Sequence, residues 1–147
     1  MKLRRLDRIL LGGLLLLILS AVAEAAALEV RDARLRLLPG DLPAGGYFSL
    51  RNVGSQSVVL VGAESAAFEH VMMHRSTEKD GMASMEQVPQ LEMAPGQTVN
   101  FAPGSYHLML MKRRGPLTIG EEVSVTLLFA DGFRFPVTFQ VVSPASQ

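Results

Sequence analysis

Cysteine is absent from this chain of 147 residues. Its absence excludes disulfide cross-links, so the hydrophobic core must hold the fold alone. It also excludes every metal site that needs a thiolate, the blue-copper type among them. Hydrophobic residues make up 48% of the chain, which is enough for a real core, and the length favours a single domain.

The chain also has no surplus of positive charge, because its 14 Lys and Arg residues are balanced by 14 Asp and Glu residues. The first 25 residues hold four of the basic and two of the acidic ones, which leaves 10 basic and 12 acidic residues in the remainder. This slightly negative balance argues against nucleic acid or an anionic membrane as the partner. We find no nucleophile–base pair, no carboxylate pair at useful spacing and no phosphate loop, so an enzyme is not expected.

The N-terminus has the three parts of a secretory signal peptide. A basic start, "MKLRRLDRIL", leads into the apolar run of residues 9–19, and Ala23 and Ala25 then fit an A-x-A cleavage site. We therefore expect residues 1–25 to be the signal and residues 26–147 to be one exported domain.

Membrane attachment is the alternative for this segment. The apolar run is shorter than the ~20 residues that a transmembrane helix needs, although an uncleaved anchor stays open. No cysteine stands near the cleavage site, so a lipid anchor is not expected. Once the signal is cleaved, we expect no stable insertion into the membrane.

The rest of the chain alternates apolar and polar residues with the period of a β-strand. Residues 133–141, "FRFPVTFQV", place three phenylalanines and two valines on one face, and "EVSVTLLF" repeats the pattern. Asp131-Gly132 between them is a strong hairpin signal. Seven further strands are predicted near Leu28–Leu37, Tyr47–Asn52, Ser57–Val61, Phe68–Ser76, Ala83–Val88, Thr98–Phe101 and His107–Met111. Short strands separated by Gly/Pro-rich turns predict an all-β fold, either a β-sandwich or a Greek-key barrel.

Histidine and methionine are concentrated in one part of the chain. All three histidines, and every methionine except Met1, fall between His70 and Met111. His107 and Met109 are two residues apart on a strand, so their side chains leave the same face. A turn at Asp80-Gly81 would fold the strand of Met85 back onto that of His74. If the strand of His107 packs nearby, two imidazoles and two thioethers can meet.

This donor set favours copper. Thioether sulfur is a poor ligand for Mg²⁺ or Ca²⁺, which prefer oxygen, and Zn²⁺ is usually held by thiolate, imidazole or carboxylate. Soft sulfur together with imidazole points to copper, and methionine especially to Cu(I). A thioether forms no disulfide, so such a site is chemically suited to an exported protein.

The spacing His-x10-Met-x21-His-x-Met, at His74, Met85, His107 and Met109, resembles that of the PCuAC family of periplasmic copper chaperones. The segments "KDGMASM", "PGSYHLMLM" and "RRGPLTIGEEV" also look like the family, and the resemblance covers nearly all of the chain after the signal. It implies a cupredoxin-like β-barrel that binds Cu(I) through these four residues. The Arg113-Arg114 pair departs from the family pattern and bears on the docking surface.

The resemblance also implies a function and partners. Members of the family carry copper without catalysing a reaction, and pass it to the dinuclear copper site of cytochrome c oxidase, often alongside a Sco-type protein. A general carrier that serves other periplasmic copper enzymes would leave the same ligand pattern. A redox copper enzyme is disfavoured, because four neutral ligands stabilise Cu(I).

A different class of function is a copper-independent exported module that binds a partner through a Met-rich face. Several residues stay open between packing and a share in the metal site: His70, Met72, Met82 and Met111. We expect Met73 and Met93 to pack in the core. Binding of Cu(II) and the oligomeric state are not decided by the sequence.

Overall fold

The computed structural model describes residues 27–146, and the regular elements in that range are all β-strands, which confirms the all-β fold. The strands are β1 (Leu28–Arg36), β2 (Ala44–Asn52), β3 (Val58–Glu64), β4 (Phe68–Lys79), β5 (Met82–Gln87), β6 (Leu91–Met93), β7 (Thr98–Phe101), β8 (Tyr106–Arg113), β9 (Glu122–Phe129) and β10 (Arg134–Val142). No helix in residues 27–146 has the length and apolar character to cross a membrane. The signal peptide predicted for residues 1–25 lies outside the described residues.

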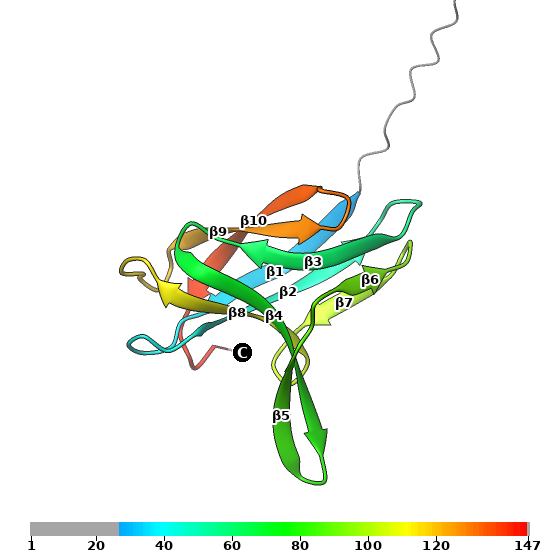
Figure 1. The fold of residues 1–147 in the computed structure, drawn as a ribbon. Coiled ribbons are helices and arrows are strands. Elements are labelled where there is room, and N and C mark those ends of the chain that lie inside the picture. The colour runs from blue at the N-terminus through cyan, green and yellow to red at the C-terminus, as the bar shows by residue number, and fades with distance from the viewer. Residues whose placement is uncertain (1–26, 147) are drawn as a thin grey trace, which may run out of the picture.

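The strands of the described range form one open sheet. Its order is β5-β4-β8-β7-β2-β1-β10-β9-β3-β6, and β8 pairs with β2 as well. The sheet bends round, so β3 and β4 touch although they lie near opposite ends of that order (Figure 1). Strand β8, which carries the His107–Met111 segment, is therefore surrounded by β4 on one side and β7 and β2 on the other.

One continuous core fills the inside of the bent sheet. It receives alternate residues from nine of the strands, as the predicted period of two requires. Phe48 stacks on Phe101 with ring centroids 4.3 Å apart and meets Phe139 edge-on at 5.6 Å. Full burial of one such side chain contributes roughly 1.5–3 kcal/mol, so the core can hold this cysteine-free fold.

Two differences from the predicted strands have local causes. Strand β2 starts at Ala44, three residues before the predicted start, because Gly46 lets its backbone lie close against β8. A Cβ at Gly46 would stand 3.0 Å from the Cβ of Leu108. Strand β6 was not predicted because its three residues are too few to show alternation, yet Met93 on it is fully buried.

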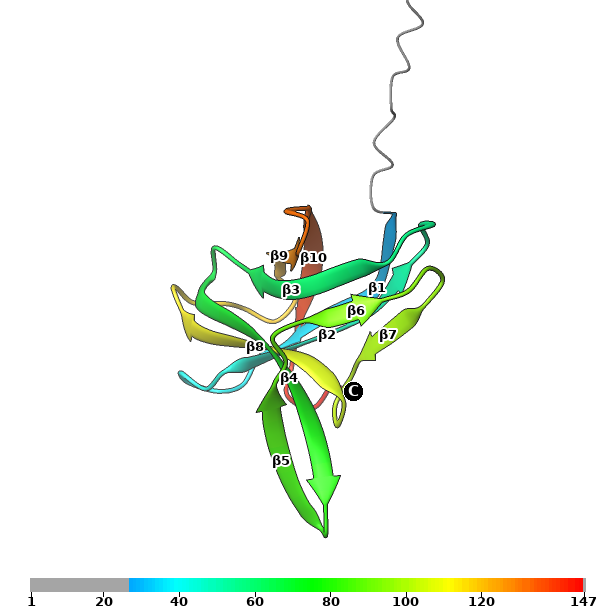
Figure 2. The same cartoon turned by 45° about the vertical axis from the view of Figure 1, so that its right-hand side comes forward.

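A long hairpin of β4 and β5 projects from the body of the sheet (Figure 2). Its turn is Asp80-Gly81, as predicted, and both residues have positive φ angles of 54° and 71°. Two positive angles make the type I′ turn whose twist suits a two-residue hairpin. All six residues of β5 are exposed, so this arm is held by β4 alone.

Candidate metal site

The register of β4 against β8 lines up three pairs of side chains. His74 lies opposite His107, Met72 opposite Met109, and His70 opposite Met111. Directly opposed residues of antiparallel strands project from the same face, with Cβ atoms about 4.5–5.5 Å apart. The residues between them, Met73, Leu108 and Leu110, are buried in the core. The six paired side chains therefore cover the outer face, and we call them the His/Met strip.

The two imidazoles at one end of the strip face each other. Their ring centroids are 5.7 Å apart and their planes meet at 76°. His107 is only 6% exposed, although it lies on the outer face. Its Nδ1 is 3.4 Å from the carbonyl oxygen of Ser105, which can only accept, so the ring proton belongs on Nδ1. Nε2 then keeps a lone pair for a metal ion.

His74 has a buried nitrogen without a hydrogen bond. Its Nδ1 is one of two such side-chain atoms in the described residues, the other being Nε of Arg36. Burial, and secondly the charge of His107, lower the pKa of His74. The ring is thus kept neutral, the form in which it can ligate. A buried nitrogen without a partner is costly unless something satisfies it, and a metal ion would do so.

Tyr47 closes the site on the side of β2, and sequence reasoning missed it. Its ring centroid is 6.5 Å from that of His107, and the Cζ of Arg36 lies 5.1 Å from its ring centroid. Gly45 makes room for the tyrosine, because a Cβ there would come within 2.9 Å of the Tyr47 hydroxyl. The Gly45-Gly46 pair inside a strand was the available signal of such a close approach.

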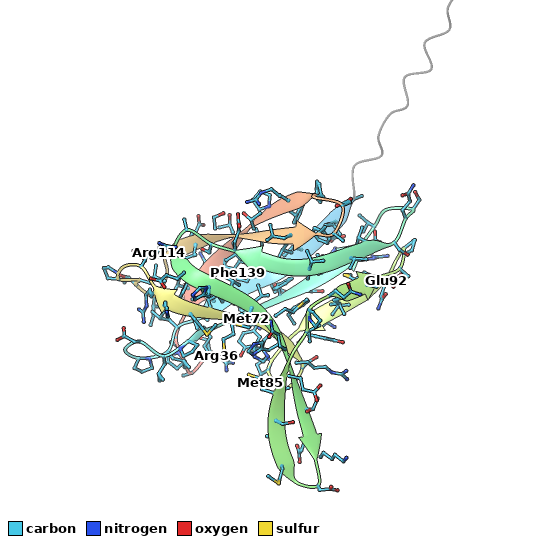
Figure 3. All side chains as sticks on the ribbon, in the orientation of Figure 1. Arg36, Met72, Met85, Glu92, Arg114 and Phe139 are labelled. Carbon is cyan, nitrogen blue, oxygen red and sulfur yellow. The ribbon has the colours of Figure 1, made fainter. Side chains whose placement is uncertain are left out.

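Met85 lies on the projecting hairpin, on strand β5. It pairs with Ser76, which is two residues beyond His74 on the same face of β4. Its side chain is 53% exposed. Figure 3 labels it at the base of the hairpin, below Met72. The structure therefore brings His74, His107 and Met109 onto adjacent positions of two paired strands and puts Met85 on the neighbouring strand, one residue pair further out.

The remaining methionines divide as their strand positions predict. Met73 is 3% exposed and Met93 fully buried, so both pack in the core as expected. Met82, beside the hairpin turn, is 74% exposed. Met72 and Met111 are half-buried members of the strip.

Harder ligands do not gather at the strip. In the part of the chain that the structure describes, no three His, Cys, Asp or Glu side chains are grouped as metal ligands. Glu69, the acidic residue beside His70, forms an ion pair with Lys112 at 3.7 Å. What the strip offers is therefore neutral imidazole and thioether, a set that suits a soft ion.

The amino-acid sequence matches one family model and a named relative over most of the described residues. The LpqE-like family model, described as "Putative lipoprotein LpqE-like", matches residues 28–141. The protein named "Putative lipoprotein Lxx21020" from Leifsonia xyli subsp. xyli is 32% identical over 119 residues, which cover 80% of this chain and 71% of that protein.

Solved structures share the fold. The Cu(I)-bound solution structure of DR1885 from Deinococcus radiodurans has a TM-score of 0.66 and 32% identity, with 83% of each chain covered. The copper-bound PCuAC domain from PmoF2 has a TM-score of 0.67 and covers 82% of this chain and 97% of that domain. At 23% identity, the second likeness bears on the fold alone.

Proposed function

Since the chain belongs to the LpqE-like family, which is the PCuAC family, we propose that it is an exported copper chaperone whose cargo is Cu(I). His74, Met85, His107 and Met109 hold the ion. The Cu(I)-bound form of DR1885, which is 32% identical to this chain, supports copper as the cargo. The protein carries the ion and catalyses no reaction of its own.

The opposed pair of His74 and His107 is the observation that carries this proposal. The buried Nδ1 of His74 lacks a partner, and the Nε2 of His107 keeps its lone pair. Met109 stands next to His107 on the same face of β8. His74, His107 and Met109 occupy adjacent positions of two paired strands, and we assign Met85 on the hairpin as the fourth ligand.

Neutral ligands also explain how the ion can leave. Two imidazoles and two thioethers do not compensate the positive charge of Cu(I), so an acceptor with charged ligands can draw it away. Met85 is the most exposed of the four and His107 the most buried. Ligand exchange therefore begins at Met85, while the two imidazoles hold the ion until last.

A Cu(I) titration against a competing chelator tests the site. His107→Ala and Met109→Ala should each weaken binding by at least about tenfold, or about 1.4 kcal/mol, because each removes a ligand. Met82→Ala is the control, since Met82 is an exposed methionine of the hairpin that carries Met85 and is not a proposed ligand. Unchanged affinity in both site variants would contradict the assignment.

A second candidate function rests on the exposed methionines of the hairpin. Met82 and Met85 present flexible apolar side chains on a projecting arm, which suits a copper-independent contact with a partner protein. Pull-down with and without a Cu(I) chelator separates the candidates. A partner retained equally in both conditions would favour the contact module.

We place the chaperone in the bacterial periplasm, reached through the signal predicted in residues 1–25. Its proposed acceptor is the copper-site subunit of cytochrome c oxidase, with a Sco-type protein alongside, and other copper enzymes are the alternative acceptors. The family model and the relative from Leifsonia xyli are described as putative lipoproteins, which agrees with export. Cell fractionation, with the mass of the recovered protein, tests both location and a mature start at Ala26.

A further inference from the structure

We propose that the His/Met strip holds a second Cu(I) position, formed by His70, Met72 and Met111 at the end away from His74. Its place follows from the strand register. The choice of copper rests on the same ligand chemistry as the proposed function. None of its three residues belongs to the four ligands of that function.

The register brings the three side chains to one spot. His70 and Met111 are directly opposed on β4 and β8. Met72 follows His70 on the same face, about 6.6–6.8 Å along the strand. Histidine and methionine are long enough to converge on an ion between such positions. One imidazole and two thioethers are the soft, neutral donors that Cu(I) accepts at low coordination number.

A hollow of about 820 Å³ opens at this end of the strip. Its lining includes His70 and Met72, but not His74 or His107. Met111 lies beside the hollow rather than in its lining, at the position opposed to His70. His70 is exposed, while Met72 and Met111 are half-buried. An ion can therefore arrive from solvent at His70 and be drawn toward the thioethers.

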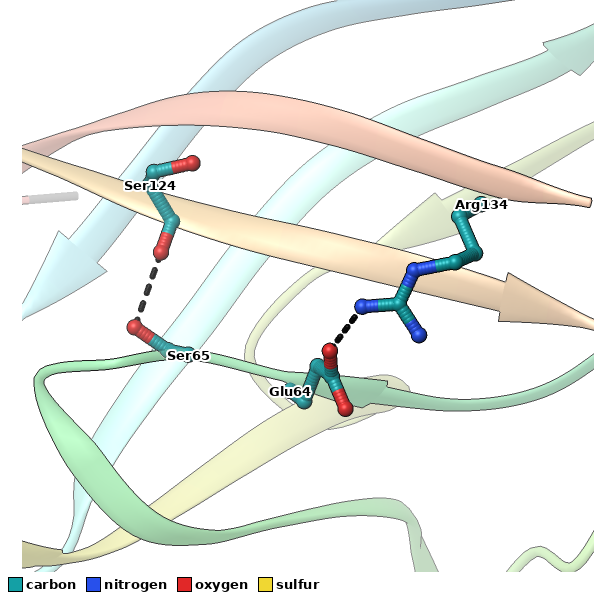
Figure 4. A network of polar contacts seen from close by, with 4 residues as sticks. All are labelled: Glu64, Ser65, Ser124 and Arg134. Atoms are coloured by element: carbon teal, nitrogen blue, oxygen red, sulfur yellow. Dashed lines mark hydrogen bonds and ion pairs between the residues drawn. The ribbon is translucent and has the colours of Figure 1, made fainter.

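The far wall of the hollow is tied in place. Ser65 donates its hydroxyl proton to the carbonyl oxygen of Ser124, 2.8 Å away, and Arg134 forms an ion pair with Glu64 (Figure 4). These contacts hold the turn that leads into β4, and with it the start of the strand that carries His70. Glu64 is already paired with Arg134 and Glu69 with Lys112, so imidazole and thioether are the donors this spot offers.

The two positions share a neighbour. Met72 is opposed to Met109, which belongs to the site of His74 and His107. A Cu(I) ion at His70 can reach that site by exchanging one neutral ligand for the next along the strip. Met109 binds first as Met111 and His70 are released, and the imidazoles of His74 and His107 bind afterwards. The ion stays Cu(I) throughout, so no electron donor or acceptor is involved. The second position is then where copper enters.

Anaerobic titration with Cu(I), followed by native mass spectrometry and by NMR of the methionine methyl groups, tests the proposal. The wild-type protein should take up two equivalents, with the methyl signal of Met111 shifting as well as that of Met109. The double variant His70→Ala, Met111→Leu should take up one equivalent of Cu(I), and the methyl signal of Met109 should still shift. Leucine for methionine conserves volume at a half-buried position, so the fold should be kept. The buried Met73 and Met93 are internal references whose signals should not move.

The matched variant His107→Ala, Met109→Leu separates this proposal from the proposed function. This variant should lose the Cu(I) equivalent bound by His74 and His107, and the methyl signal of Met111 should still shift when Cu(I) is added. A wild-type protein that takes up one equivalent and leaves Met111 unmoved would overturn the second position alone. A wild-type protein in which Met111 shifts while Met109 does not would contradict the four-ligand site instead. One equivalent that shifts both signals would mean one shared site and would also overturn the second position.

Discussion

His107 combines two properties that a carrier needs from a single residue. It is 6% exposed because His74 and Tyr47 pack beside it, and its Nδ1 is directed at Ser105. Packing holds the ring in position and the carbonyl selects its tautomer, so little ordering is left to occur when copper binds. Strand phase predicted which face His107 would occupy. It did not predict the burial, which comes from Tyr47 on a strand distant in sequence.

The lowered pKa of His74 makes the stability of the metal-free protein depend on pH. In the unfolded chain this imidazole takes up its proton near the ordinary value of ~6.5, whereas in the folded chain it does so only at lower pH. The unfolded state therefore binds more protons between the two values. Stability from this group is complete above about pH 6.5 and is lost as the pH falls through the lowered pKa.

Thermal unfolding of the metal-free protein from about pH 8 to about pH 4 measures this effect. The Tm of the wild type should fall more steeply below about pH 6.5 than that of His74→Gln, which keeps polarity and size but cannot titrate there. The difference between the two curves isolates His74 from the other histidines. Parallel curves would contradict a buried, neutral His74.

Asn52 is a second residue whose role is visible only in the structure. It is fully buried at the end of β2, donates from Nδ2 to the carbonyl oxygens of Gln56 at 2.7 Å and Met93 at 3.1 Å, and accepts from the backbone of Gly54 at 3.0 Å. Asn52→Ala should lower the free energy of unfolding by about 3 kcal/mol, because these buried backbone groups lose their partner.

Urea unfolding checks the Asn52 prediction. The midpoint should fall while the slope of free energy against urea concentration stays constant. Asn100→Ala, at an exposed position of β7, is the control and should change stability by less than about 0.5 kcal/mol. Similar midpoints for both variants would show that the Asn52 contacts add nothing to stability.

At the scale of the element, the ends of a strand could be predicted only where apolar and polar residues alternate over a long run. Strand β9 begins and ends where "EVSVTLLF" does, because its first six residues alternate polar and apolar and its burial alternates to the last residue. Strand β4 continues three residues past its predicted end, to Lys79, since polar residues on a projecting hairpin show no apolar alternation. The start of β2 was not predicted because glycines show no apolar alternation. Strand β6 was not predicted because three residues are too few to show it. Such elements depend on their neighbours more than on their own pattern.

The β5 arm should become ordered when copper binds. Strand β5 is hydrogen-bonded only to β4, and its six residues are exposed, so it can open locally in the metal-free protein. A bond from Met85 to the ion would tie β5 to His74 and to the buried His107. Backbone amide exchange of residues 82–87 should slow at least about tenfold on addition of Cu(I).

Met85→Ala is the variant that tests this coupling. Its β5 amides should exchange at the metal-free rate even when Cu(I) is bound by the other three ligands. Met82→Ala, on the same strand, should behave like the wild type. Equal protection in the wild type and in Met85→Ala would remove Met85 from the ligand set.

At the scale of the whole molecule, the decisive fact is which strands become neighbours. Strands β4 and β8 are separated by three strands in sequence, yet they pair over most of their length. Alternation shows which face of a strand is buried but not which strand lies beside it. The sequence therefore predicted each candidate ligand from its chemistry and spacing. It did not predict that β8 pairs with β4, which brings their side chains together.

The His/Met strip exists only because of that pairing. A register shift of one residue would turn the strip inward on one strand and separate His74 from His107. Core residues on the opposite face, such as Leu108 and Leu110, oppose such a shift because they would move into water. The hydrophobic core thus sets the geometry of the proposed ligands, although no core residue is one of them.

Copper delivery is the prediction that involves the molecule as a whole. The Cu(I)-loaded protein, mixed with the metal-free copper domain of a cytochrome c oxidase subunit, should pass most of its ion to that domain. The driving force is charge, because thiolate ligands neutralise Cu(I) whereas imidazole and thioether do not. Transfer should begin at the exposed Met85, so Met85→Ala, which lacks the fourth ligand, should release the ion faster than the wild type.

Absorbance and NMR signals of the acceptor domain follow the transfer, and the NMR spectrum of the donor should return to its metal-free form. Met82→Ala, with an intact ligand set, is the control and should transfer at the wild-type rate. If Cu(I) stays on the chaperone at equal concentrations of both proteins, delivery to the oxidase is wrong, while the binding site stands on its own titration. If Met85→Ala retains the ion longer than the wild type, exchange does not begin at Met85, and the order of ligand release proposed for this site is wrong.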